Sequence, residues 1–142
     1  MKGRTYRFMS DPLFPFGFGL SYTRFSVGNA RIYQNVIKMA ESVGLTIPVS
    51  NTGKIAGTEI IQVYVKKVNE TNGPLKTLRD FRRVNIAAGK TVEIIIDLPL
   101  TAFEFFDKSS GKMTVTAGEY EIWYGNSSAS EDLKMERITI LM

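Results

Sequence analysis

The sequence predicts an all-β fold in which two antiparallel sheets face each other across one core. Apolar and polar residues alternate along most segments, and a period of two marks a strand with one buried face. Turn residues such as Gly, Asn and Pro separate these segments at short intervals, and no segment shows the strand–helix alternation of a parallel sheet. The length of 142 residues fits one domain with a short appendage.

The first clear strands are expected at residues 43–49 and 59–67. Residues 43–49 carry a large apolar side chain at every second position and stop at the turn sequence Asn51-Thr52-Gly53. In residues 59–67 the odd positions from 61 onward would face the core, and the even positions, including Tyr64, would form an amphipathic outer face. The polar stretch 67–76 then predicts a surface connection.

The middle of the chain is expected to contain a third strand at 84–88 and a fourth at 92–98. Gly89-Lys90 between them indicates a tight turn, so these two strands are predicted to pair as a hairpin. Thr101, followed three residues later by Glu104, fits a capping box and predicts about one helical turn.

Short strands are expected at 113–115, 120–124 and 138–140, with a loop of small and acidic residues at 125–132. Tyr120 stands near the start of its strand, where a tyrosine hydroxyl can bond to the backbone at the corner between two sheets; otherwise it is a core aromatic. About seven or eight short strands without Cys favour an immunoglobulin-like or fibronectin type III-like Greek-key sandwich.

Residues 1–25 differ from the rest, and we assign the sandwich to residues 26–142. Pro and Gly interrupt the first segment too often for a strand or a helix, which makes it an irregular arm. Its aromatic side chains are too many to remain in water without a partner surface. Either the arm folds back over its own sandwich or it docks on another domain. Seven of the chain's 16 aromatic residues lie here: Tyr6, Phe8, Phe14, Phe16, Phe18, Tyr22 and Phe25.

The sequence contains neither Cys nor His. Their absence excludes disulfide frameworks, Cys/His zinc sites, Cys nucleophiles and Ser-His-Asp mechanisms within the chain. The carboxylates lack the spacing of an EF-hand loop, so neither a metal nor any other cofactor is expected.

The net charge of +4 is mild, and the basic residues form no long run, so nucleic acid is not expected as a partner. No stretch approaches the roughly 18 apolar residues that span a bilayer, so no membrane contact is expected either. Residues 1–6 show no secretory signal. If a longer parent protein carries one, the compartment would be periplasmic or extracellular.

The most specific segment is Pro12-Leu13-Phe14-Pro15-Phe16-Gly17-Phe18-Gly19-Leu20-Ser21-Tyr22-Thr23. It closely resembles the linker that precedes the C-terminal domain of glycoside hydrolase family 3 enzymes. Asp80 stands where Gly is usual in that family, and Phe14 and Phe18 stand where Tyr is common. The resemblance covers about residues 3–128 and continues, in matching order, through 49–53, 56–59, 62–65, 78–84, 117–120 and 125–128.

This resemblance implies a parent that is a β-glucosidase, β-xylosidase or related exo-glycosidase, which hydrolyses terminal non-reducing β-linked sugars. The chain would be its fibronectin type III-like C-terminal domain. In that family the nucleophilic Asp belongs to an N-terminal barrel and the acid/base Glu to the sandwich domain after it, so no catalytic residue is carried over. The chain alone is expected not to be an enzyme, and its expected role is to pack on and stabilise the catalytic domains of the same polypeptide.

The candidate docking residues are therefore those of the arm: Phe14, Phe16, Phe18, Leu20 and Tyr22. The alternative is a carbohydrate-binding or protein-interaction module without an enzymatic role. For sugar binding the candidates are Trp123, the single tryptophan, and Tyr64, because aromatic faces stack on sugars. An oligo- or polysaccharide is then the expected partner.

Two further ideas concern the parent's chemistry. Glycoside hydrolysis needs two carboxylates about 5–9.5 Å apart, one with a raised pKa. The pairs Glu119/Glu121 and Glu93/Asp97 each share one strand face, but the alternation predicts that both pairs are solvent-exposed. The connection 67–76 could also reach over the active-site mouth of the parent.

Overall fold

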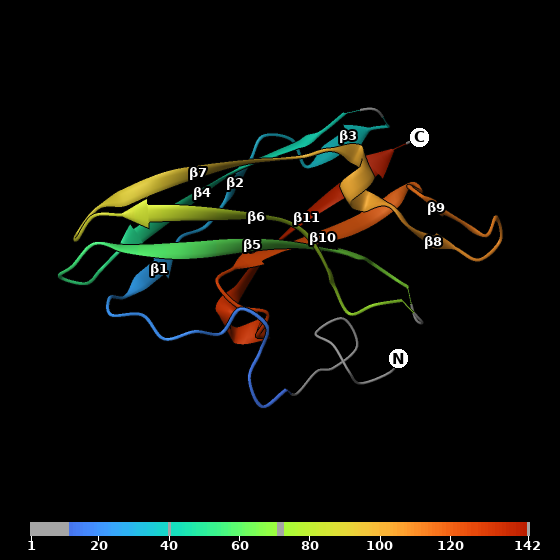
Figure 1. Cartoon of the computed structure of the whole chain (residues 1–142). Coiled ribbons are helices and arrows are strands. Elements are labelled where there is room, and N and C mark those ends of the chain that lie inside the picture. Colours follow the sequence, from blue (N-terminus) through green and yellow to red (C-terminus); the bar gives the residue numbers. More distant parts are fainter. Residues whose placement is uncertain (1–11, 40, 71–72, 142) are drawn as a thin grey trace.

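The computed structural model describes residues 12–39, 41–70 and 73–141. In this part of the chain, short connections join eleven strands and two 3-10 helices, and the strands form two main sheets that enclose one core (Figure 1). The predicted all-β, fibronectin type III-like sandwich is confirmed.

The smaller main sheet is built around β4 (Val43–Asn51). Strand β7 (Thr91–Leu98) pairs with β4 in antiparallel register along its length. The other edge of β4 is shared by two short strands, β1 (Phe25–Val27) and β2 (Arg31–Ile32).

The larger sheet has five strands and contains most of the polar clusters described below. Its order is β3 (Val36–Lys38), β11 (Leu133–Leu141), β10 (Gly118–Gly125), β5 (Gly57–Lys67) and β6 (Thr77–Ile86). All neighbours are antiparallel except β3 and β11, which pair in parallel. The helix η1 (Leu100–Phe103) and the hairpin of β8 (Phe105–Asp107) and β9 (Lys112–Thr114) lie between β7 and β10 in the chain, whereas the helix η2 (Ser130–Asp132) connects β10 to β11.

The predicted hairpin between residues 84–88 and 92–98 is wrong. Strand β6 pairs with β5 and β7 pairs with β4, so the turn at Gly89-Lys90 passes from one sheet to the other. Gly89 adopts a φ of +69°, and its N–H donates to the Asn51 carbonyl. Alternation identifies the buried face of a strand but does not specify which strand it pairs with. A tight turn can connect two strands of different sheets as well as two strands of one hairpin.

The predicted capping box is also wrong in detail. The helical turn exists as η1, but its N-cap is Pro99 and no side chain caps it. Thr101 lies inside the helix, so its hydroxyl is not at the capping position.

The core lies between the two sheets, and alternate residues of β4, β5, β7 and β10 supply most of it. Tyr120 is fully buried, and Phe103 packs edge-on against its ring at 5.6 Å between centroids. The Tyr120 hydroxyl donates to the Thr116 carbonyl at 2.8 Å, which confirms the predicted backbone bond at the sheet corner. Aromatic burial and a satisfied hydroxyl therefore fix this end of the sandwich.

Candidate functional site

The arm is described from Pro12 onward and runs without regular structure to β1; the predicted arm residues Tyr6 and Phe8 lie outside the described residues. A turn forms at Pro15, whose carbonyl accepts a hydrogen bond from the Phe18 N–H at 3.0 Å. Gly17, inside this turn, has a φ of +84°, a conformation that favours glycine. The turn brings the arm onto the outer face of the five-stranded sheet.

One end of this segment is anchored at Phe16 and Gly17. The Phe16 carbonyl accepts a hydrogen bond of 2.7 Å from the Ser128 N–H. Gly17 lies so close to Gln62 that an added Cβ would stand 1.9 Å from the amide nitrogen Nε2. Only a residue without a side chain fits between the arm and β5 at this point.

The other end is anchored by Thr23 and the buried Asn51. The Thr23 hydroxyl donates to Oδ1 of Asn51 at 2.7 Å, and the same oxygen accepts the Gly53 N–H at 3.0 Å. Nδ2 of Asn51 donates to the carbonyls of Ile55 and Ile86, at 2.7 and 2.9 Å. One amide therefore ties the arm to the turn after β4 and to the end of β6.

Polar contacts beneath the arm cover the outer face of β5. The Gln62 amide donates to the Asn126 carbonyl at 3.2 Å, and the Tyr64 hydroxyl donates to Oε1 of Gln62. Lys76 donates to the Ser128 carbonyl at 2.6 Å, and its ammonium lies 5.6 Å from the centre of the Tyr64 ring. Burial lowers the pKa of Lys76, and the nearby Glu131 charge opposes this shift.

The expectation that Tyr64 lies on an exposed outer face is wrong. Its side chain is 0% exposed, because the outward side of β5 is itself covered. A sugar therefore cannot reach Tyr64 in this structure. Alternation of residues along one strand could not reveal that cover, since it comes from residues distant in the sequence.

From Phe14 to Tyr22, the arm turns its large side chains outward. Phe18 and Phe16 are 51% and 52% exposed, Phe14 is 68%, Leu20 is 96% and Tyr22 is 100%. The five candidate docking residues are therefore between half and fully exposed. The Phe14 and Phe18 rings pack on each other, with centroids 5.6 Å apart.

An open groove of about 570 Å³ separates the arm from the sheet edge. Phe18 and Leu20 line one side, and Ile60 and Arg83, which are register partners on β5 and β6, line the other. Phe81, exposed on the same outer face next to Gln62, extends the apolar area. We call this set the arm surface: Phe14, Phe16, Phe18, Leu20, Tyr22, Ile60 and Phe81.

Trp123 lies on the same sheet face, in register with Tyr64 on β5 and Met135 on β11, and is half-buried. Its indole N–H donates to Oε2 of Glu121 at 3.1 Å. These contacts give Trp123 a structural role within the five-stranded sheet.

The prediction that Glu121 is solvent-exposed is wrong, because only 7% of this residue is exposed. Arg137 donates to one carboxylate oxygen at 3.1 Å, Trp123 donates to the other, and the Lys66 ammonium lies 3.6 Å away. Glu119, Glu93 and Asp97 are exposed as predicted. With three partners, Glu121 acts as a paired anion of the sheet.

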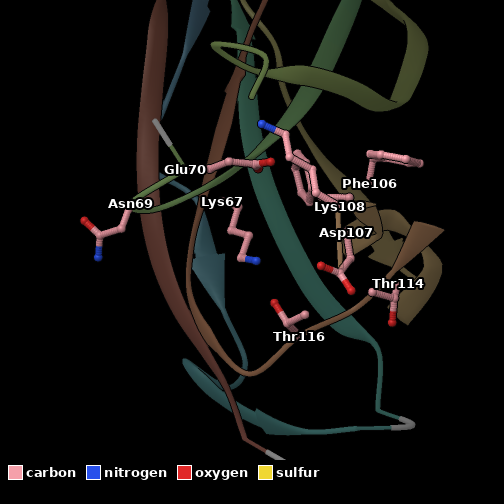
Figure 2. A pocket seen from close by; sticks show the side chains of 9 residues that line it. Lys67, Asn69, Glu70, Phe106, Asp107, Lys108, Thr114 and Thr116 are labelled. Carbon is pink, nitrogen blue, oxygen red and sulfur yellow. The ribbon is translucent and has the colours of Figure 1, made fainter. Parts of the chain in front are cut away.

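A second cleft, of about 260 Å³, lies between the end of β5 and the β8–β9 hairpin. Figure 2 shows Lys67 and Asp107 on opposite sides of it, and Glu70 also lines it. Hydrogen bonds from Ser109 and Ser110 hold the pKa of Asp107 well below its usual range. A glycosidase acid needs the opposite shift, so Asp107 is unsuited to that role.

The described residues contain no group of three or more acidic side chains placed to hold a metal ion. None of the helical turns in the described ranges has the length and apolar character needed to cross a membrane.

Comparison with known proteins gives consistent relatives. Residues 59–128 match the family described as "Fn3-like: Fibronectin type III-like domain". A xylan 1,4-β-xylosidase from Xylanibacter ruminicola is 46% identical over 99% of this chain, which spans only 16% of that relative's length.

Solved structures agree with these sequence relatives. A Listeria innocua β-glucosidase in complex with glucose superposes with a TM-score of 0.82 at 28% identity, over 92% of this chain and 18% of that one. A Bifidobacterium adolescentis GH3 β-glucosidase gives a TM-score of 0.76 at 33% identity, over 89% of this chain and 18% of that one.

Proposed function

Since the chain belongs to the fibronectin type III-like domains of family 3 glycosidases, we propose that it is a non-catalytic accessory domain that packs on the catalytic domains of its parent. The arm surface supports this proposal most directly. The arm is tied to the sandwich by the Phe16 carbonyl and the Thr23 hydroxyl, while Leu20 and Tyr22 between these anchors are almost completely exposed.

The energetics favour a covered arm. A fully covered aromatic ring removes roughly 150–250 Å² from water, which contributes about 4–6 kcal/mol at about 25 cal/mol per Å² before ordering costs. Because both ends of the segment are already fixed, less chain entropy is lost on docking than for a free tail. An apolar segment that is already fixed at both ends is therefore a favourable docking element.

The parent in this proposal is a β-glucosidase-like or β-xylosidase-like hydrolase that removes terminal non-reducing β-linked sugars. The names of the relatives support that class, and the chain's small share of their lengths supports its being one part of a longer polypeptide. The lowered pKa of Asp107 makes this carboxylate unsuited to act as the acid of a glycosidase.

The test compares Leu20→Ser with Phe106→Ser in both the 142-residue chain and the full-length polypeptide. Phe106 is 56% exposed on the β8–β9 hairpin and serves as the matched control outside the arm surface. Leu20→Ser should leave the melting temperature of the chain unchanged and lower that of the full-length polypeptide by about 1 °C, because it removes roughly 2 kcal/mol of buried contact. Phe106→Ser should change neither.

A full-length polypeptide that keeps its melting temperature and glycosidase activity with Leu20→Ser and Tyr22→Ser combined would refute the docking role. A loss already visible in the 142-residue chain would instead mean that the arm stabilises its own sandwich.

A further inference from the structure

The four-stranded sheet presents a second candidate site on its outer face, on the side of the sandwich that does not carry the arm. Tyr33 follows β2 and is 68% exposed, yet its position is fixed. Its hydroxyl shares a 2.8 Å hydrogen bond with Oγ1 of Thr46, and its N–H donates to the Gly44 carbonyl at 3.2 Å. The ring of Tyr33 is therefore held in place before any ligand arrives.

Gly44 allows the ring to lie directly on β4. A Cβ at Gly44 would stand 2.5 Å from Cδ2 and 3.0 Å from Cε2 of Tyr33, so the ring fills the space that a side chain would occupy. One edge of the ring is thus supported by the sheet, while most of its surface faces solvent.

Tyr33 borders an open cleft of about 420 Å³, which we call the Tyr33 cleft. The register of β4 and β7 sets Asp97 opposite Gly44 and Ile95 opposite Thr46. Ile95 is 67% exposed, so it and Tyr33 give the cleft two apolar contacts. Its polar side chains come from three different segments: Gln34, Ser42 and Asp97.

This combination fits the chemistry of a sugar ring. A pyranose has an apolar C–H face that packs on an aromatic ring, and hydroxyl groups at its edge that donate to carboxylates and amides. Asp97 disfavours acidic sugars, and the adjacent Arg31 is engaged with Glu93 at 2.5 Å. The apolar part of the Tyr33 cleft, formed by Tyr33 and Ile95, is far smaller than the roughly 800 Å² per partner of a stable protein interface. A small ligand is therefore a better fit to this cleft than a protein partner.

We propose that the Tyr33 cleft binds a neutral oligosaccharide of pyranose units, with one sugar stacked on Tyr33 and its hydroxyls directed to Asp97 and Gln34. The Tyr33 cleft is separate from the arm surface, which carries the proposed docking role. The arm covers Gln62 on the larger sheet, whereas Tyr33 rests on β4 of the smaller one. Docking through the arm surface therefore leaves the cleft open.

The experiment is a titration of the isotope-labelled 142-residue chain with xylohexaose and with cellohexaose, followed by NMR. Chemical shifts should move at Tyr33, Ser42 and Asp97, with a dissociation constant on the order of 1 mM, as expected for a single aromatic contact. Tyr33→Ala should weaken binding at least about tenfold, and Tyr33→Phe should retain it within about twofold, because the stacking ring remains.

Tyr33 could instead serve only to cover Gly44, as aromatic residues do for glycines in sheets. In that case the Tyr33→Ala chain loses stability, but no shifts arise in the unmodified chain at about 10 mM of either sugar, and the proposal fails. It also fails if the shifts cluster at Trp123. If Tyr33→Ala does not fold, Asp97→Asn and Ile95→Ser provide the test, since both side chains are exposed, and unchanged binding in both would overturn the proposal.

Discussion

Replacement of Gly17 by alanine should detach the arm from the sandwich. The φ of +84° would cost an alanine about 1–2 kcal/mol. The new Cβ would also stand 1.9 Å from Nε2 of Gln62, so the Gln62 side chain must move. That movement breaks its bonds to the Asn126 carbonyl and the Tyr64 hydroxyl, each worth about 0.5–1.5 kcal/mol. Together these effects destabilise the anchored state by about 2–5 kcal/mol.

Gly19 provides the matched control, two residues away on the same arm. Nothing lies within 4 Å of a Cβ placed there, and its φ lies outside the left-handed region. Gly19→Ala should therefore leave the anchor intact and stabilise the chain slightly, by up to about 1 kcal/mol, through the unfolded state.

The assay is hydrogen exchange at the Ser128 amide, which donates to the Phe16 carbonyl. A loss of about 2 kcal/mol should raise the exchange rate of this amide roughly 30-fold in Gly17→Ala, whereas Gly19→Ala should stay within about twofold of the parent sequence. Equal rates in both variants would refute the idea that close packing of Gly17 on Gln62 holds the arm.

Three further predictions concern the sandwich. Asn51→Ala should cost about 2–4 kcal/mol in thermal denaturation because buried partners lose their bonds, whereas Ser50→Ala should change stability by about 0.5 kcal/mol or less; equal losses would contradict this. Tyr120→Phe should cost about 0.5–1.5 kcal/mol in urea, since the bond to the Thr116 carbonyl is lost, and an unchanged midpoint would argue against it. The pKa of Asp107 is lowered, so its contribution to stability is present above pH 3.8 and is lost as the pH falls through the lower folded value; an NMR titration with a midpoint at or above 3.8 would exclude this.

The sequence predicted the parts of the fold that depend on local alternation. Strands β4, β7 and β10 show their buried faces directly in the order of apolar residues, and Tyr120 could be placed at the sheet corner. The partner of β7 could not be predicted, because it is set by the crossing at Gly89-Lys90 between sheets, and local pattern does not encode which strands pair.

The candidate site was predicted in composition but not in geometry. The crowding of aromatic residues identified the arm, yet the anchors Gly17 and Asn51 depend on contacts with Gln62 and Thr23 that only the fold creates. For Asn51, the sequence Asn51-Thr52-Gly53 indicated a turn, and Asn side chains in turns commonly form hydrogen bonds to the backbone. For Tyr33 the sequence offered no such signal. Its importance comes from the packing of its ring on Gly44, and that contact exists only in the folded chain.

The two faces of the sandwich make the two proposals separable by experiment. Leu20→Ser removes a side chain from the arm surface and should change only the stability of the full-length polypeptide. Tyr33→Ala removes the platform on the other sheet and should change only the response to sugars, together with any local loss at Gly44. Because Leu20 belongs to the arm on the larger sheet and Tyr33 packs on β4 of the smaller one, their effects should add in the double variant. A sugar response that depends on Leu20 would mean that the arm reaches the Tyr33 cleft, which the anchoring of Gly17 on the larger sheet argues against.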